Sequence, residues 1–141
     1  MGQSKKAVVE NFLSKFHGGS WPDFDQVVSL FSEEAVCYVV YPSTPPVHGR
    51  QALKEELQRQ SKDSSNPRCE IKGIACEGDR VYVERVDYFV TLGKPISVCF
   101  CSVFEVGDDH LIKAWREYLD PADPARQLGI GGEDLEKLLQ G

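Results

Sequence analysis

The chain has 141 residues, the size of one ordinary domain, and the sequence predicts a single domain over residues 1–141. Apolar residues make up 41% and charged residues 27%, which is typical of a globular protein. The net charge is −6 and no basic stripe is present, so we expect no nucleic-acid partner. No apolar run approaches the roughly 20 residues of a membrane helix, and the first residues, MGQSKK, lack the apolar segment of a secretory signal. We therefore expect a cytoplasmic protein that makes no membrane contact.

Cysteine and histidine residues could hold a metal, but their spacing argues against it. The cysteine count is odd, no CxxC pair occurs, and the three histidines lie far apart in the sequence. No glycine-rich phosphate loop is present either. We expect neither a metal nor a cofactor, and reduced thiols, with Cys99 and Cys101 packed as small apolar side chains in a sheet.

Helical periodicity dominates the first part of the chain. Apolar residues recur at helical spacing over residues 5–17. Ser20 is expected to cap a second helix that has Pro22 in its first turn. A strand is expected over residues 35–41. The segment PSTPPVHG then predicts a loop, because its prolines lack backbone donors, and a third helix is expected over residues 50–62.

From Arg68 onward the apolar period changes to the alternation of β-strands. The turn sequences EGD, LGKP and GDD divide this part into four strands. Strands joined by short turns pair as an antiparallel meander. The sequence therefore predicts an α+β fold in which three N-terminal helices pack on one face of a curved sheet. A further short helix is expected over Glu133–Gln140.

The stretch VYVERVDYFV, residues 81–90, is a predicted strand that carries two charges on one side. Alternation places Arg85 and Asp87 on the same side of the strand. They share that side with three apolar residues, Val81, Val83 and Phe89. If this side lines the interior, each ionised group costs roughly several kcal/mol unless it is paired and hydrogen-bonded.

The last strand, HLIKAWREYLD, repeats the pattern, with Glu117 on the same side as Trp115. If Glu117 shares the concave side of the sheet with Arg85 and Asp87, two carboxylates flank one guanidinium. Two like charges raise one carboxyl pKa while the arginine holds the other group ionised, so an acid and a base coexist near neutral pH. The alternative is a buried ion network that only ties the strands together.

Three segments resemble the limonene-1,2-epoxide hydrolase family. It lies within the nuclear transport factor 2-like superfamily, which also holds ketosteroid isomerases and SnoaL-like polyketide cyclases. The family joins an ERxD strand to a WRDYFD strand, and this chain has ERVD at residues 84–87 and WREYLD at residues 115–120. The family's PPxxGR segment is similar to PPVHGR at residues 45–50.

The resemblance spans roughly residues 5–128 and implies a single nuclear transport factor 2-like domain. The implied fold has three N-terminal helices packed on a strongly curved, mixed but mainly antiparallel sheet. This sheet forms a conical pocket, an architecture called a cystatin-like α+β roll. The resemblance also implies a homodimer formed through the open face of the sheet.

The resemblance further implies a role for each charged residue. Asp87 is the implied acid that protonates an epoxide oxygen, Glu117 the implied base that takes a proton from water, and Arg85 the bridge between them. Water attacks the oxirane carbon in one step and leaves a vicinal diol, without a metal or a covalent intermediate. The family has Asp at the position of Glu117 and holds its water with a Tyr and an Asn on the first strand.

In this chain the first strand presents Cys37, Val39 and Tyr41 to the inside, so it offers no asparagine there. Tyr41 is able to supply one hydrogen bond to a water or a substrate oxygen. Further apolar pocket residues are expected to be Phe12, Phe16, Val83, Phe89, Val98, Phe100 and Trp115. Such a lining suits a small apolar substrate with one polar reacting group.

Three functions follow from these residues. The first is hydrolysis of a small apolar epoxide. The second is a proton-shuttling isomerisation or cyclisation of a polyketide, terpenoid or steroid-like molecule, which needs an acid and a base but no positioned water. The third is a non-catalytic small-molecule binding module, because one fold hosts many functions.

Overall fold

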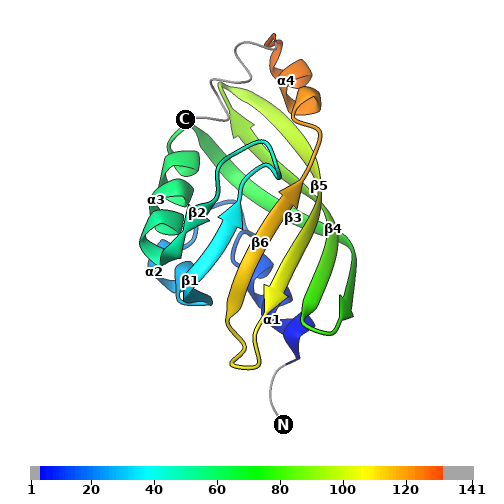
Figure 1. Ribbon diagram of the computed structural model, residues 1–141. Coiled ribbons are helices and arrows are strands. Elements are labelled where there is room, and N and C mark those ends of the chain that lie inside the picture. The colour runs from blue at the N-terminus through cyan, green and yellow to red at the C-terminus, as the bar shows by residue number, and fades with distance from the viewer. Residues whose placement is uncertain (1–3, 132–141) are drawn as a thin grey trace.

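The computed structural model describes residues 4–131, and its centre is an open six-stranded sheet (Figure 1). Its strands are β1 (Phe31–Tyr38), β2 (Val47–His48), β3 (Ser64–Glu77), β4 (Arg80–Thr91), β5 (Lys94–Val106) and β6 (Ile112–Tyr118). They lie in the order β2-β1-β6-β5-β4-β3. The pair β1–β6 is parallel and the other four neighbouring pairs are antiparallel. The predicted mixed, mainly antiparallel sheet is therefore confirmed.

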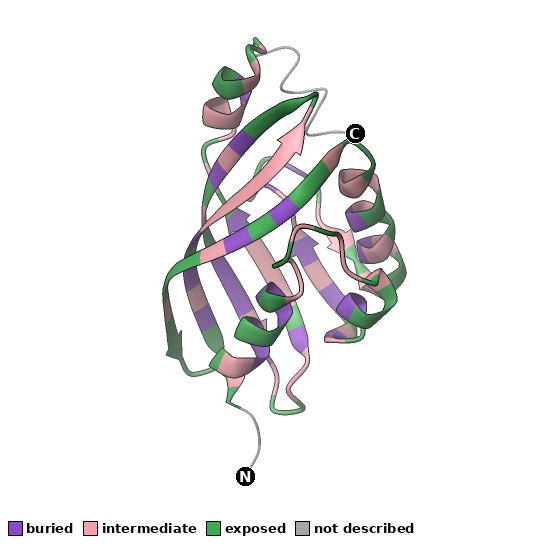
Figure 2. Ribbon diagram, turned by 180° about the vertical axis from the view of Figure 1, so that it is seen from behind, coloured by how far each residue is buried: buried purple, intermediate pink, exposed green. Residues whose placement is uncertain are grey.

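Four helices are described with this sheet: α1 (Lys5–Ser14), α2 (Phe24–Val28), α3 (Gly49–Lys62) and α4 (Ala122–Leu128). The first packs against β3, β4 and β5, the third packs against β1, β2 and β3, and α2 packs on α3. Seen from behind, α1, α2 and α3 lie on the same side of the sheet (Figure 2). The predicted α+β class with three N-terminal helices is confirmed.

Local sequence explains where the first two helices begin. Ser4 Oγ accepts a hydrogen bond from the Ala7 N–H at 3.1 Å, which caps α1. The cap of α2 is Asp23, whose carboxylate accepts from the Asp25 N–H at 2.9 Å. The prediction that Ser20 caps this helix was wrong, because the chain remains irregular until Asp23 supplies the capping oxygen.

Other boundaries also differ from the prediction. The first strand ends at Tyr38, three residues before the predicted end, because the chain turns there: the Thr44 N–H donates to the Val40 carbonyl at 2.9 Å. The proline-rich segment is not wholly irregular, since Val47 and His48 form β2. Helix α4 was not predicted. The helix expected over Glu133–Gln140 lies outside the described residues.

The core lies between α1 and the sheet, and Phe12 is at its centre with no exposed surface. Its ring makes edge-to-face contacts with Phe31 at 5.2 Å, Phe104 at 5.8 Å and Trp115 at 5.0 Å between ring centroids. Aromatic pairs at these distances add about 0.5–1.5 kcal/mol each to the free energy gained from burial. Through Trp115, this aromatic cluster adjoins the charged residues of β4 and β6.

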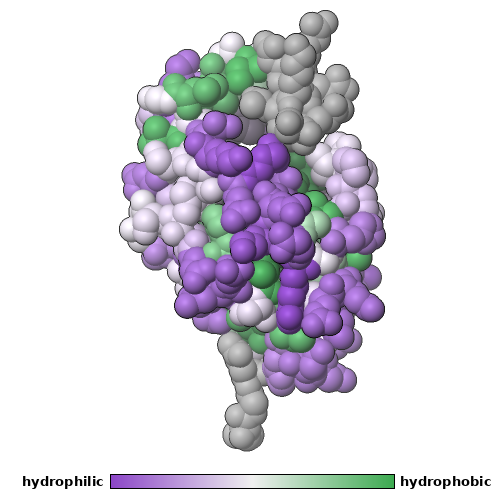
Figure 3. All heavy atoms as spheres, turned by 90° about the vertical axis from the view of Figure 1, so that its left-hand side faces the viewer, coloured by the Kyte–Doolittle hydropathy of each residue, from purple (hydrophilic) through white to green (hydrophobic). Residues whose placement is uncertain are grey.

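The outer surface carries both hydrophilic and apolar residues. Hydrophilic residues cover much of the face on which α3 lies (Figure 3). The opposite face of the sheet leaves Cys99 and Cys101 of β5 exposed, so the prediction that they pack in the interior was wrong. The three N-terminal helices cover only the other face. No described helix is long and apolar enough to cross a membrane.

Candidate active site

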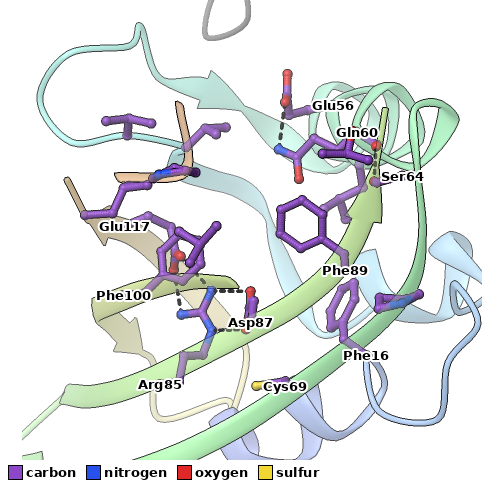
Figure 4. A pocket seen from close by; sticks show the side chains of 18 of the residues that line it. Phe16, Glu56, Gln60, Ser64, Cys69, Arg85, Asp87, Phe89, Phe100 and Glu117 are labelled. Atoms are coloured by element: carbon purple, nitrogen blue, oxygen red, sulfur yellow. Dashed lines mark hydrogen bonds and ion pairs between the residues drawn. The ribbon is translucent and has the colours of Figure 1, made fainter. Parts of the chain in front are cut away.

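Arg85 is the central residue of the candidate site, and it is only 3% exposed. Alternation along β4 points it to the concave side of the sheet. Its Nε donates to Asp87 Oδ1 at 3.0 Å and its Nη2 to Asp87 Oδ2 at 3.3 Å. On the other side, Nη1 donates to Glu117 Oε1 at 3.1 Å and Nη2 to Glu117 Oε2 at 2.6 Å (Figure 4). The structure thus brings Arg85, Asp87 and Glu117 together in one hydrogen-bonded network.

Glu117, on β6, is buried and accepts hydrogen bonds on both oxygens. Its Oε1 accepts from Ser102 Oγ at 2.6 Å, from the indole Nε1 of Trp115 and from Arg85. Its Oε2 accepts from Arg85 alone. Every partner is a donor, which is the environment of an ionised carboxylate. Oε1 has no capacity left, and only Oε2 can accept another proton donor.

Asp87 differs from Glu117 because it reaches the cavity, with 29% of its side chain exposed. Burial raises the pKa of Asp87 above its ordinary value, and the nearby Arg85 only partly opposes this. For Arg85, burial acts to lower the pKa, but Glu117 and Asp87 outweigh it and raise the pKa. Asp87 therefore keeps its proton to a higher pH than an ordinary aspartate does, and its partly exposed side chain can donate that proton into the cavity.

Two buried thiols lie beside the carboxylates. Cys69 of β3 pairs in register with Asp87 of β4. Burial, followed by the charge of Asp87, raises the pKa of the Cys69 thiol to about 12. Burial and the charge of Glu117 raise the pKa of Cys37 to about 12 in the same way. Both thiols are neutral near pH 7, so neither offers a thiolate nucleophile.

The network opens into a cavity of about 350 Å³. Most of the predicted pocket residues line this cavity: Phe12, Phe16, Cys37, Val39, Phe89, Val98, Phe100 and Trp115. The volume lies at the lower end of the range of typical small-molecule sites, about 300–1,000 Å³. The cavity can therefore hold a molecule with a mainly apolar body beside Asp87.

Two predicted pocket residues lie elsewhere. Val83 is fully buried in the core and does not line the cavity. Tyr41 follows the end of β1, and its ring packs against Tyr38 at 4.9 Å and Tyr118 at 5.1 Å between centroids. The alternation used to place Tyr41 inward stops at the turn that begins after Tyr38. The predicted hydrogen bond from Tyr41 to a substrate or water therefore has no support in the structure.

The sequence interpretation missed several residues of the site. Ser102 of β5 is fully buried and contacts both Arg85 and Glu117. Its position on the same side of β5 as Phe100 was a usable signal. Helix α4 was also missed, although it brings Ala125 and Leu128 to the cavity. It is fixed to β5 by Gln127, whose amide nitrogen donates to the Ser97 carbonyl at 2.8 Å and whose oxygen accepts from the Ser97 N–H at 2.9 Å.

Within residues 4–131, no group of three or more His, Cys, Asp or Glu side chains is arranged to hold a metal ion. The network itself offers one buried guanidinium, that of Arg85, and two carboxyl groups, those of Asp87 and Glu117.

Comparisons with known proteins agree with this geometry. The family model described as "SnoaL-like domain" matches residues 9–115. A solved structure of an LEH-like epoxide hydrolase from M. tuberculosis is 27% identical, covers 88% of each chain and superposes with a TM-score of 0.73.

A second solved structure is that of a hypothetical protein from Catenulispora acidiphila with a ketosteroid isomerase-like fold, in complex with trimethylamine. It is 17% identical over 89% of this chain and 95% of that chain, with a TM-score of 0.77, and it shows the shared fold only. No curated protein sequence matches the chain.

Proposed function

Because this chain belongs to the SnoaL-like domain family, we propose that its cavity is an active site that hydrolyses a small, mainly apolar epoxide to a vicinal diol. The observation that carries the proposal is Asp87, a carboxyl group with a raised pKa that reaches an apolar cavity and is linked through Arg85 to a second, buried carboxylate. The similarity to an LEH-like epoxide hydrolase supports this choice of reaction.

In the proposed reaction, Asp87 donates its proton to the epoxide oxygen while the carbon–oxygen bond breaks. Water attacks the oxirane carbon, and Glu117 Oε2 takes the proton that this water loses. Arg85 holds both carboxyl groups in place and stabilises the negative charge left on Asp87. Such an acid and base typically contribute about 10²- to 10⁴-fold to the rate.

The test is a single turnover with excess enzyme and a panel of cyclic and aryl epoxides in oxygen-18 water. Direct attack by water places oxygen-18 in the diol during the first turnover, whereas attack by a carboxylate would first transfer an unlabelled protein oxygen. Asp87→Asn is expected to abolish diol formation. Glu84→Gln, an exposed change on the other side of β4, is the matched control and should keep full activity. Diol formation that survives Asp87→Asn would refute this role.

A second candidate function is a proton-shuttling isomerisation or cyclisation of a polyketide, terpenoid or steroid-like molecule. It is favoured by the three donors on Glu117 Oε1 and by the apolar Cys37 and Val39, which offer little to hold a water molecule. Asp87 would then move a proton between two substrate carbons. Incorporation of deuterium next to the carbonyl of a cyclic enone in deuterium oxide, lost in Asp87→Asn, tests this function. A binding module would show neither reaction.

We also propose that the chain forms a homodimer through the uncovered face of the sheet. Tyr118 of β6 is a large aromatic residue that is 39% exposed, and it pairs in register with the exposed Cys101 of β5 on that face. Light scattering coupled to size-exclusion chromatography measures the mass in solution. A monomer at all protein concentrations would refute the homodimer.

A further inference from the structure

A second polar group of residues lines the cavity at its α3 end, away from Asp87. It consists of Glu56, Arg59 and Gln60 of α3 together with Ser64, the first residue of β3. Arg59 Nη2 donates to Glu56 Oε2 at 2.6 Å, and Gln60 Nε2 donates to the same oxygen at 2.8 Å. Ser64 Oγ donates to the main-chain carbonyl of Gln60 at 2.8 Å. These residues form a connected network that the charged network of Arg85 does not touch.

The two polar ends lie on opposite sides of Phe89 (Figure 4). Ser64 pairs in register with Thr91 of β4, four residues beyond Asp87 on the same side of that strand. Four residues of strand correspond to about 13 Å. A ligand that reaches both ends must therefore be elongated, with an apolar middle that contacts Phe89.

The hydrogen bonds fix which atom of Gln60 is available. A carboxylate has no donor, so the Gln60 amide nitrogen must face Glu56, and its carbonyl oxygen must point the other way. In Figure 4 the Gln60 side chain points into the cavity between Glu56 and Phe89. No hydrogen bond to this carbonyl oxygen is found from any residue between 4 and 131. The α3 end thus presents an open acceptor to a ligand.

The charges at this end select the kind of ligand group. Glu56 is matched by Arg59, so the pair carries no net charge. A ligand carboxylate would lie beside the oxygens of Glu56 and Gln60 as well as the Arg59 guanidinium, and a ligand ammonium would lie beside that guanidinium as well as Glu56, so the pair favours neither charge. A neutral hydroxyl group can donate to the Gln60 oxygen without an unpaired charge.

We propose that Gln60 forms a second binding site, which holds a neutral hydroxyl group at the far end of an elongated substrate. The substrate class is then an amphiphilic molecule with its reacting group at Asp87, an apolar middle at Phe89 and a hydroxyl at Gln60. This inference rests on the proposed function only in placing the reacting group at Asp87. The inference adds a hydroxyl group to the substrate predicted from the sequence, which had a single polar reacting group.

Matched probes test this site by equilibrium binding. The probes are 1,2-epoxydecane, 9,10-epoxydecan-1-ol and 9,10-epoxydecanoic acid, which differ only at the far end. Binding is followed by tryptophan fluorescence, because Trp21 and Trp115 line the cavity. All measurements use the Asp87→Asn background to prevent turnover. We expect the alcohol to bind about 2- to 10-fold more tightly than the plain epoxide, as one net hydrogen bond gives, and the acid to gain no such advantage.

Gln60→Met removes the acceptor and keeps a residue with good helix propensity. It should abolish the preference for the alcohol over 1,2-epoxydecane. Gln58→Met, an exposed change on the same helix, is the control and should keep the preference.

Any of three results would overturn the proposal. The protein with Gln60 in place could bind the alcohol and the plain epoxide with equal affinity, all probes could fail to bind, or the preference for the alcohol could survive Gln60→Met. A preference for the alcohol without diol formation in the unmodified protein would support the second site and refute hydrolysis.

Discussion

Replacing Glu117 by Gln should destabilise the protein far more than replacing Asp87 by Asn. All four groups bonded to Glu117 are donors, so the amide NH₂ of Gln must face a donor at whichever oxygen position it takes. Arg85 also loses its most buried counter-charge. Breaking a buried ion pair by removing one partner costs about 3–5 kcal/mol of the free energy of unfolding.

Asp87→Asn should cost only about 1 kcal/mol. The Asn side chain is partly exposed and can turn its NH₂ toward the cavity while its oxygen accepts from Arg85, and the charge that is removed is already disfavoured by burial. Urea unfolding followed by circular dichroism gives both values. The control is Glu105→Gln on β5, which breaks a partly exposed pair with Arg116 and should cost roughly 0.2–1 kcal/mol. If Glu117→Gln costs no more than Glu105→Gln, the buried network described for Arg85 does not hold in solution.

Three further predictions follow from the site. The pKa of Asp87 is raised in the folded state, so the folded protein binds more protons than the unfolded chain. The free energy of unfolding should therefore fall as pH rises from the ordinary aspartate pKa through the raised one. Urea unfolding measured at several pH values should show this fall, and Asp87→Asn should remove it. Cys37 and Cys69 should react with a thiol reagent only on unfolding, whereas the exposed Cys76 should react at once; five fast thiols by absorbance would contradict the buried positions. If hydrolysis is the native reaction, Glu117→Asp alone should lower the rate of diol formation, because it shortens the proposed base. If the native reaction is instead the second candidate function, Glu117→Asp combined with Val39→Asn should raise diol formation from a low level, because the pair restores the family's base and supplies a polar group for water; product analysis distinguishes the two results.

Alternation along single strands was enough to place Arg85 and Asp87 on one side of β4, and Glu117 on the same side of β6 as Trp115, because successive side chains point to opposite faces whatever the neighbouring strands are. That these two sides face the same cavity was an expectation that the family resemblance supplied. The same rule failed for Tyr41, because the strand ends at Tyr38 and the rule has no meaning in the turn that follows.

Features that depend on distant parts of the chain could not be predicted in this way. Ser102 belongs to the site because it pairs in register with Glu117 of β6 and with Val83 of β4. This register is set by the whole sheet. Which face of the sheet is covered depends on where the helices pack, so the exposure of Cys99 and Cys101 could not be read from their strand alone.

The structure also shows that the two interpretations of the charged residues are compatible, because the network that ties the strands together is the same one that holds the proposed acid and base. Glu117 is bonded to residues of β4, β5 and β6, so it ties three strands together and fixes the guanidinium of Arg85. Asp87 accepts two hydrogen bonds from that guanidinium, and it reaches the cavity. A rigid, structural Glu117 is what holds Arg85 in one position, and a fixed Arg85 is what keeps the proton of Asp87 aimed at the substrate. The buried ion network is therefore a precondition of the proposed acid catalysis at Asp87, and this is why Glu117→Gln is expected to lower both stability and activity, whereas Asp87→Asn is expected to lower mainly activity.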